Sequence, residues 1–459
     1  MNKAFDAIII GAGQAGPSLA GRLTAAGMRV LVVERKLFGG TCVNTGCMPT
    51  KTLVASAYAA HLARRGANYG VNIGSPISID MKRVKQRADT VSFNARDGVE
   101  KWLRGMDGCT VVKGHARFTG PHDIEIDGEV FTAPRIFINA GGRANVPDMP
   151  GIEKIAYLTN TSILALDTLP KHLVVVGGSY IGLEFAQMYR RFGANVTIVE
   201  KGPRLISRED EDVSDAIKDI LEAEGISCRL NAECISFKSH ADGTQVNLDC
   251  SAGSPSVLGS HVLLAIGRRS NTDDLGLDRA GIRTDERGYI TVDDQLETNV
   301  EGVWALGDCN GRGAFTHTAY NDFEIVAANL LDNENRKVSD RISGYALYID
   351  PPLGRVGLSE AQARKTGRPL LVSKRPMTRV GRAVEKDETQ GFMKVIADAD
   401  TQKILGAAIL GTGGDEAIHG ILDIMNADVS YDKLKWAVPI HPTVSELIPT
   451  LLGDLKRVA

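Results

Sequence analysis

Two cysteines separated by four residues are the side chains of this sequence best suited to chemistry. Cys42 and Cys47 lie in the segment Gly-Gly-Thr-Cys-Val-Asn-Thr-Gly-Cys-Met-Pro-Thr-Lys, residues 39–51. The spacing alone leaves three interpretations open: a redox-active thiol pair, half of a metal site, or two inert buried thiols. A metal site needs further ligands nearby in the sequence, and none follow this segment. The context therefore favours a redox pair that passes electrons, and no metal is predicted.

Composition and charge place the chain among soluble α/β proteins of several domains. It has 459 residues with 43% hydrophobic, 24% charged and 49 glycine residues, which indicates two to four domains with many tight turns. The net charge of -3 gives no basic surface for nucleic acid. No apolar run approaches the roughly 20 residues that span a bilayer, so no membrane segment is expected.

The cysteine pattern indicates a reducing compartment. Seven cysteines are an odd number, and the five outside the pair are scattered: Cys109, Cys228, Cys234, Cys250 and Cys309. That is not the framework of a secreted disulfide-rich protein. The first residues lead directly into a predicted strand, so no signal peptide is expected. We therefore expect a cytoplasmic protein, where a close cysteine pair is more often catalytic than structural.

An internal repeat predicts the elements that position the cysteines. Residues 7–34 and 173–200 match at a constant offset, with Gly11 equivalent to Gly177 and Glu34 equivalent to Glu200. Each copy has a buried strand, a glycine-rich turn, a helix and a second strand that ends in a carboxylate. This order is the dinucleotide-binding βαβ unit.

Each repeat has the parts needed to hold one dinucleotide. The glycines let the backbone approach the pyrophosphate, the helix N-terminus faces its charge, and the carboxylate accepts the ribose hydroxyls. Two copies therefore predict two dinucleotides, a resident flavin and a diffusible nicotinamide. Ser179 replaces the middle glycine of the second copy. Glu200 would repel a 2′-phosphate and so favours NADH, whereas Lys201 and Arg204 leave NADPH possible.

The chain resembles the FAD-dependent pyridine nucleotide–disulfide oxidoreductases essentially from end to end. This group contains dihydrolipoamide dehydrogenase, glutathione reductase and mercuric reductase. The most specific elements are residues 39–51, the two glycine fingerprints, Ala-Leu-Gly-Asp-Cys-Asn-Gly at 305–311 and Ile-His-Pro-Thr-Val-Ser-Glu at 440–446. The resemblance implies a homodimer in which the C-terminal domain of one subunit completes the active site of the other.

The expected fold class is α/β, with two Rossmann-like domains for FAD and NAD(P) and a C-terminal α+β dimerisation domain. The C-terminal domain is expected to contain strands near 392–397 and 404–410 and helices near 416–427 and 444–455. The predicted boundaries are 1–148 for the FAD domain, 149–272 for the NAD(P) domain, 273–342 for the continued FAD domain and 343–459 for the interface domain.

The resemblance implies unequal roles for the two cysteines. Cys47 would be the thiol that faces the flavin, and Cys42 the thiol that exchanges with substrate. His441 would be the general acid–base for Cys42, supplied by the partner subunit and oriented by Glu446. Proton transfer of this kind needs a group whose pKa lies near neutrality, and histidine has one.

The cofactor contacts also follow from the resemblance. Lys51 and Glu184 would form an ion pair beside the flavin, Asp308 would hold its ribityl chain, and Tyr180 would cover the nicotinamide pocket, with packing against its helix as the alternative role. Expected FAD contacts are Gly11, Gly13, Gly16, Glu34, Gly40, Thr41, Lys51, Gly141, Asp308, Thr318 and Ala319. Expected NAD(P)H contacts are Gly177, Tyr180, Ile181, Glu200 and Gly267.

The substrate stays open among three hypotheses. Our main hypothesis is an enzyme that moves electrons between NAD(P)H and a disulfide or dithiol through FAD. The alternatives are reduction of mercuric or cupric ion or of a quinone, and a non-enzymatic role as the flavoprotein subunit of a larger complex. Mercuric reductases carry a C-terminal cysteine pair and usually tyrosine at the position of His441, and this sequence has neither feature.

Overall fold

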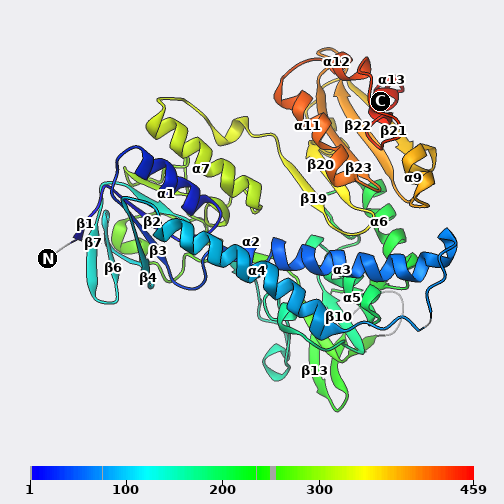
Figure 1. Ribbon diagram of the computed structural model, residues 1–459, viewed down its shortest axis with the longest axis horizontal. Helices are drawn as coiled ribbons and strands as arrows, with labels where there is room; N and C mark the ends of the chain where they lie inside the picture. Colours follow the sequence, from blue (N-terminus) through cyan, green and yellow to red (C-terminus); the bar gives the residue numbers. More distant parts are fainter. Residues whose placement is uncertain (1–2, 75, 234, 249–254, 459) are drawn as a thin grey trace.

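Two parallel sheets, each built on one copy of the glycine repeat, organise the N-terminal three-quarters of the chain. The computed structural model describes residues 3–74, 76–233, 235–248 and 255–458, so Cys234 and Cys250 lie outside the described residues. Figure 1 shows the two sheets at opposite ends of the molecule, with the C-terminal domain beside the second. The predicted fold class is confirmed.

The first sheet collects strands from both sides of the second repeat. Its order is β18-β8-β2-β3-β4 and all neighbours are parallel. The strands are β2 (Ala7–Ile10), β3 (Val30–Glu34), β4 (Cys109–Lys113), β8 (Ile136–Ile138) and β18 (Val303–Ala305). The central strand β2 is buried at every position, as expected for a parallel sheet covered on both faces.

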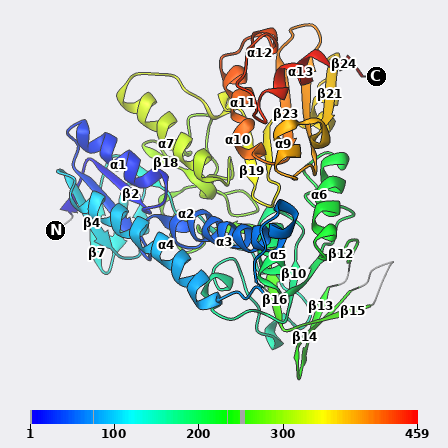
Figure 2. The ribbon, with the colours of Figure 1, turned by 45° about the vertical axis from the view of Figure 1, so that its right-hand side comes forward.

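The second sheet repeats this plan with four parallel strands in the order β12-β11-β10-β16. They are β10 (His172–Val176), β11 (Asn195–Val199), β12 (Ser227–Arg229) and β16 (His261–Leu264). Two small antiparallel additions flank the parallel sheets. The one beside the first sheet consists of β5 (Arg117–Gly120), β6 (Asp123–Ile126) and β7 (Glu129–Thr132), with β1 (Lys3–Ala4). The one beside the second sheet consists of β13 (Ser236–His240), β14 (Gly243–Asn247) and β15 (Ser256–Gly259). Figure 2 shows β13–β15 extending away from the C-terminal domain.

The equivalence of the two repeats is visible in their turn geometry. Gly11 and Gly177 have φ angles of +108° and +111°, a region that L side chains rarely adopt. A Cβ atom at Gly16 would lie 2.4 Å from the carbonyl oxygen of Gly11, and one at Gly182 would lie 2.2 Å from that of Gly177. Glycine is therefore required twice in each turn, so that the helix can begin close against its strand.

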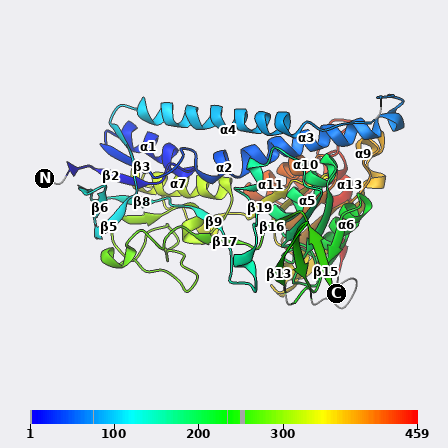
Figure 3. The same ribbon diagram turned by 90° about the horizontal axis from the view of Figure 1, so that it is seen from below.

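The helices that follow connect the redox segment to both sheets. After the two glycine turns come α1 (Ala15–Ala25) and α5 (Tyr180–Phe192). The cysteine segment forms α2 (Gly40–Asn44) and α3 (Cys47–Arg65), and α4 (Met81–Arg104) packs against α3. Figure 3 shows α4 and α3 running along one side of the molecule from the first sheet to the second. Because α3 also packs against α5, the cysteine helix is held by both halves.

The C-terminal domain is an antiparallel sheet with short helices, as predicted. Its order is β19-β20-β23-β22-β21-β24. The strands are β19 (Gly344–Leu347), β20 (Leu353–Gly357), β21 (Leu370–Pro376), β22 (Phe392–Asp398), β23 (Ile404–Leu410) and β24 (Lys456–Arg457). The other helices are α6 (Glu211–Ala223) and α7 (Thr316–Leu331) in the preceding domains, and α8 (Glu360–Arg364), α9 (Gly381–Glu385) and α12 (Asp432–Lys435) here.

Two predicted helices differ in detail from the observed ones. The helix expected at 416–427 is divided into α10 (Gly414–Ala417) and α11 (His419–Asn426), and the one expected at 444–455 is only α13 (Leu447–Gly453). His441 therefore precedes its helix by six residues, three more than the predicted bounds imply. Among the described helices, none has the length and apolar character needed to cross a bilayer.

Candidate active site

The two cysteines lie where α2 turns into α3. Cys42 is in the middle of α2, and Cys47 is the first residue of α3. Both thiols are free, and they are close enough to influence each other's pKa. The Thr316 hydroxyl oxygen, at the start of α7, lies 3.2 Å from Cys47 Sγ. Thr316 is 269 residues away in the chain, and no motif in the sequence marks this contact.

The two thiols have opposite electrostatic environments. The hydrogen bond from Cys42, followed by the Thr316 hydroxyl and the charge of Lys51, outweighs burial and lowers the pKa of Cys47 to about 6. The same hydrogen bond, together with burial, raises the pKa of Cys42. The position of Cys47 at the N-terminus of a helix favours a thiolate in the same sense. In the dithiol form these surroundings favour the proton on Cys42 and the negative charge on Cys47.

Lys51 and Glu184 form the ion pair that the sequence predicted. Lys51 Nζ lies 2.5 Å from Glu184 Oε2, and the Glu184 side chain is only 4% exposed. The backbone N–H of Tyr348 donates to the other Glu184 oxygen at 3.0 Å, and Lys51 Nζ lies 4.5 Å from the centre of the Tyr348 ring. Tyr348 follows β19 of the C-terminal domain and was missed because no motif marks it. Contacts from two other domains thus hold the Lys51 ammonium in place, one helical turn after Cys47.

The first glycine cradle fits a dinucleotide. The Glu34 carboxylate accepts the backbone N–H groups of Ala12 at 2.9 Å and Lys36 at 2.7 Å, which fixes it at the end of its strand. A Cβ at Gly40 would lie 2.8 Å from the Cα of Gly13, so the α2 segment closes on the turn through glycine backbone alone. A backbone-lined turn with a fixed carboxylate is what FAD requires at its pyrophosphate and ribose.

The second cradle has the same construction, residue for residue. The Glu200 carboxylate accepts the N–H groups of Gly178 at 2.5 Å and Gly202 at 2.7 Å. These donors are the repeat equivalents of Ala12 and Lys36 in the first cradle. Tyr180 is the first residue of α5, directly after this turn, and its ring lies 5.7 Å from that of Phe315.

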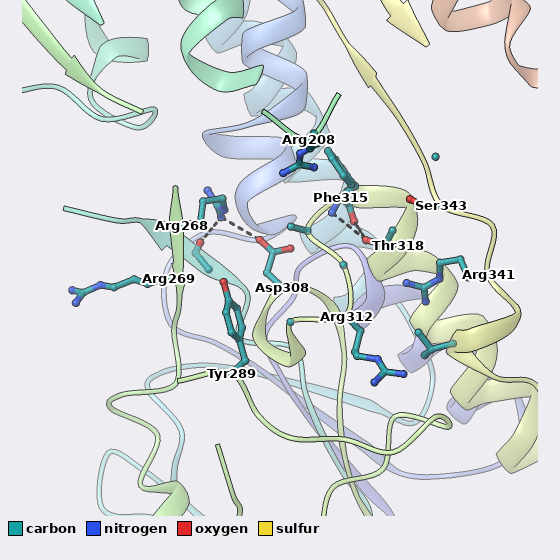
Figure 4. A pocket seen from close by; sticks show the side chains of 16 residues that line it. Arg208, Arg268, Arg269, Tyr289, Asp308, Arg312, Phe315, Thr318, Arg341 and Ser343 are labelled. Carbon is teal, nitrogen blue, oxygen red and sulfur yellow. Dashed lines mark hydrogen bonds and ion pairs between the residues drawn. The ribbon is translucent and has the colours of Figure 1, made fainter. Parts of the chain in front are cut away.

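A cavity of about 340 Å³ lies between the two sheets and the C-terminal domain (Figure 4). Its polar lining includes Asp308 and Thr318, both predicted from the sequence, and the cations Arg208, Arg268, Arg312 and Arg341. Arg268 pairs with Asp308 at 3.3 Å. The cationic lining suits phosphate groups. It was missed in the sequence because the arginines come from four separate segments.

His441 and Glu446 form a pair on the molecular surface. His441 Nδ1 lies 2.9 Å from Glu446 Oε2, while the imidazole side chain is 80% exposed. The preceding segment exposes Trp436, Val438 and Ile440, whose exposed fractions are 77%, 96% and 80%. Within the part of the chain that the structure describes, Glu446 is the only hydrogen-bond partner of the imidazole. The structure thus brings His441 together with Glu446, but not with Cys42 of the same chain.

The family follows from comparison with known proteins. The model of the pyridine nucleotide-disulphide oxidoreductases matches residues 5–322, and the model of their dimerisation domain matches residues 344–452. The chain belongs to this family. As a pyridine nucleotide–disulfide oxidoreductase it is an enzyme that uses FAD and NAD(P)H, so the predicted class of activity and both cofactor types are confirmed. Its C-terminal part is the family's dimerisation domain.

Individual relatives cover almost the whole chain, and they carry different names. The probable pyridine nucleotide-disulfide oxidoreductase RclA of Escherichia coli is 35% identical, over 99% of this chain and 100% of the relative. The Cu(II) complex of the HOCl-induced flavoprotein disulfide reductase RclA superposes with a TM-score of 0.88 at 36% identity, over 97% of this chain and 99% of that one. A dihydrolipoyl dehydrogenase of Thermus scotoductus is 32% identical, over 97% of this chain and 96% of its own.

The electrostatics of this oxidoreductase predict which thiol ionises first. In the reduced protein the alkylation rate of Cys47, followed by peptide mass spectrometry, should rise with pH through a midpoint near 6, because its pKa is lowered to about 6. Lys51→Met should move this midpoint up by about one unit, since a nearby positive charge is lost. Cys109, whose pKa is raised by burial, is the internal control and should react only at higher pH. A Cys47 midpoint near the ordinary value of about 8.5 would contradict the assignment.

Proposed function

We propose that Cys42 and Cys47 form the redox-active disulfide of this enzyme, with Cys47 facing the flavin and Cys42 facing the substrate. The observation that carries this proposal is the position of Cys47: it is the first residue of α3, its Sγ lies 3.2 Å from the Thr316 hydroxyl oxygen, and Lys51 follows one turn later on the same helix. When bound, FAD supplies the transfer of two electrons from NAD(P)H to the disulfide. A thiolate fixed by the helix N-terminus and Lys51 is suited to lie next to that flavin.

The protein side chains then perform a dithiol–disulfide exchange. His441 removes the proton from Cys42, whose sulfur attacks the substrate disulfide and forms a mixed disulfide. The first substrate thiolate leaves and takes the proton from His441. The Cys47 thiolate attacks Cys42, re-forms the Cys42–Cys47 bond and releases the second substrate thiolate, which takes a proton from water. Two electrons pass to the substrate, and Glu446 keeps the imidazole oriented.

We infer that the working unit is a homodimer in which His441 acts on the partner's cysteines. The support is the surface around His441, where Trp436, Val438 and Ile440 are almost fully exposed in one chain. Apolar side chains in such a row favour burial against a second copy. The dimerisation domain of the family contains the same segment.

We also propose the domain boundaries 1–148, 149–272, 273–342 and 343–459. The strand order supports them, because β18 at 303–305 returns to the sheet of β2 after the chain has built the second parallel sheet. A cytoplasmic location is likewise proposed, and it is supported by the free thiols of Cys109, Cys228 and Cys309.

A second candidate substrate is a soft metal ion reduced at the dithiol. The observation that favours it is the similar RclA structure, which was solved as a Cu(II) complex. Among the described residues there is no group of three or more histidine, cysteine or acidic side chains placed to hold a metal ion. Any metal substrate would therefore depend on Cys42 and Cys47 themselves.

Purified holoenzyme should oxidise NADH faster than NADPH in the presence of a disulfide substrate, because the Glu200 carboxylate repels a 2′-phosphate. The measurement is nucleotide consumption with lipoamide, glutathione disulfide, cupric ion, mercuric ion or a quinone as acceptor. Turnover with lipoamide or glutathione disulfide supports the disulfide proposal. Turnover only with metal ions selects the second candidate, and no turnover by the isolated dimer would favour a subunit of a larger complex.

Mixed dimers test where His441 acts. A dimer of one Cys42→Ser subunit and one His441→Gln subunit should retain about half of the wild-type activity, because one site receives both substitutions and the other receives none. Each homodimeric variant, carrying its substitution at both sites, is the matched control and should have little disulfide reductase activity. Mixed dimers as inactive as the two homodimers would place His441 in the site of its own chain.

A further inference from the structure

Phe315 and Thr316 form the cap where α7 begins, and they contact both the redox pair and Tyr180, the residue expected to cover the nicotinamide pocket. Thr316 lies 3.2 Å from Cys47, whereas the ring of its neighbour Phe315 lies 5.7 Å from that of Tyr180. The cap is rigid: the Phe315 N–H donates to Thr318 Oγ1 at 3.1 Å, and the Thr318 hydroxyl donates to the Phe315 carbonyl at 2.8 Å. A shift of Thr316 therefore moves Phe315 with it.

Tyr180 is held in place by the ring of Phe315 and by the side chains that pack around that ring. The Phe315 ring stacks on Tyr345 with centres 5.7 Å apart and planes 4° apart. The Arg208 guanidinium lies 5.8 Å from the centre of the Tyr180 ring and 5.6 Å from that of Tyr345. Tyr345 is anchored in turn by a short hydrogen bond from its hydroxyl to the buried Glu209. Tyr180 thus packs on Phe315, which stacks on the anchored Tyr345 and is the chain neighbour of Thr316, the residue in contact with Cys47.

The contact at Cys47 must change with redox state. Reduction by one NADH breaks the Sγ–Sγ bond, adds two electrons and one proton, and leaves a thiol on Cys42 and a thiolate on Cys47. A thiolate is a strong acceptor for the Thr316 hydroxyl, whereas a disulfide sulfur is a weak one and is displaced toward Cys42. The Thr316 contact that positions the cap is therefore stronger in the dithiol form than in the disulfide form.

We propose that Thr316 and Phe315 are positioning residues that couple the redox state of Cys47 to Tyr180, so that the dithiol enzyme binds the pyridine ring of the nucleotide less tightly than the disulfide enzyme. This inference rests on the proposed function, in which Cys42 and Cys47 are the redox pair. It gives the cycle an order: after the electrons reach the dithiol, the oxidised nucleotide is released and the entrance stays closed until substrate has reacted. Because coupling is reciprocal, nucleotide binding also disfavours the Cys47 thiolate.

The test compares the dissociation constants of two redox-inactive probes on holoenzyme in its disulfide and two-electron-reduced forms. The probe 3-aminopyridine adenine dinucleotide has a ring that must displace Tyr180, whereas ADP-ribose lacks that ring. The first should bind the disulfide form at least about 5-fold more tightly, and ADP-ribose should bind both forms equally. Thr316→Val should bring the ratio to one, Thr316→Ser should restore it, and Phe315→Leu should abolish it with the Thr316 contact intact.

Equal affinity of the ring-containing probe for both forms of the wild type would overturn the coupling. An unchanged ratio of the two dissociation constants in Thr316→Val would also overturn it. Counting the thiols of denatured protein before and after reduction separates this failure from failure of the proposed function. If reduction adds two thiols at Cys42 and Cys47 but the ring-containing probe binds both forms equally, only the coupling is refuted. If no thiols are gained at these positions, the redox pair itself is refuted.

Discussion

The arrangement depends on the electrostatic difference between two neighbouring thiols. The pKa of Cys47 is lowered and that of Cys42 is raised, because the thiols interact with each other and the groups around Cys47 favour its thiolate. The N-terminus of α3, the Lys51 ammonium and the Thr316 hydroxyl all favour charge on that sulfur and not on its neighbour. Without this asymmetry, the two thiols would be equivalent, and neither would be preferred as the one that passes the electrons from the flavin on to the substrate.

The surrounding fold maintains this difference between the two thiols. The α3 helix carries both Cys47 and Lys51, and α5, which follows the second glycine cradle, supplies the buried Glu184 that fixes Lys51. The C-terminal domain adds the backbone N–H of Tyr348 on the other oxygen of that carboxylate. One ion pair therefore joins the flavin side, the nicotinamide side and the dimerisation domain. Placing a carboxylate at 4% exposure is tolerated because both of its oxygens are bonded.

Local patterns in the sequence predicted much of this, and long-range contacts account for the rest. The glycine cradles could be predicted because a turn of positive φ between a buried strand and a helix leaves its own signature, repeated at Gly11 and Gly177. The Lys51–Glu184 pair required the resemblance to a family. Thr316 and Tyr348 were not predictable, since each meets its partner across more than 150 residues, with no motif around it. The helix near His441 was placed too early, because the polar Thr443–Ser445 segment does not continue the apolar pattern of α13.

The visible absorption spectra of two single variants decide which of the two sulfur atoms carries the charge beside the flavin. A thiolate in contact with oxidised flavin produces a long-wavelength absorption band, so the band reports which sulfur carries the charge. The account predicts that holoenzyme with Cys42→Ser has this band without any reductant, because its Cys47 thiolate has no disulfide partner. It predicts that NADH-reduced Cys47→Ser lacks the band. A band in Cys47→Ser that is absent from Cys42→Ser would contradict the assignment and exchange the roles of the two cysteines.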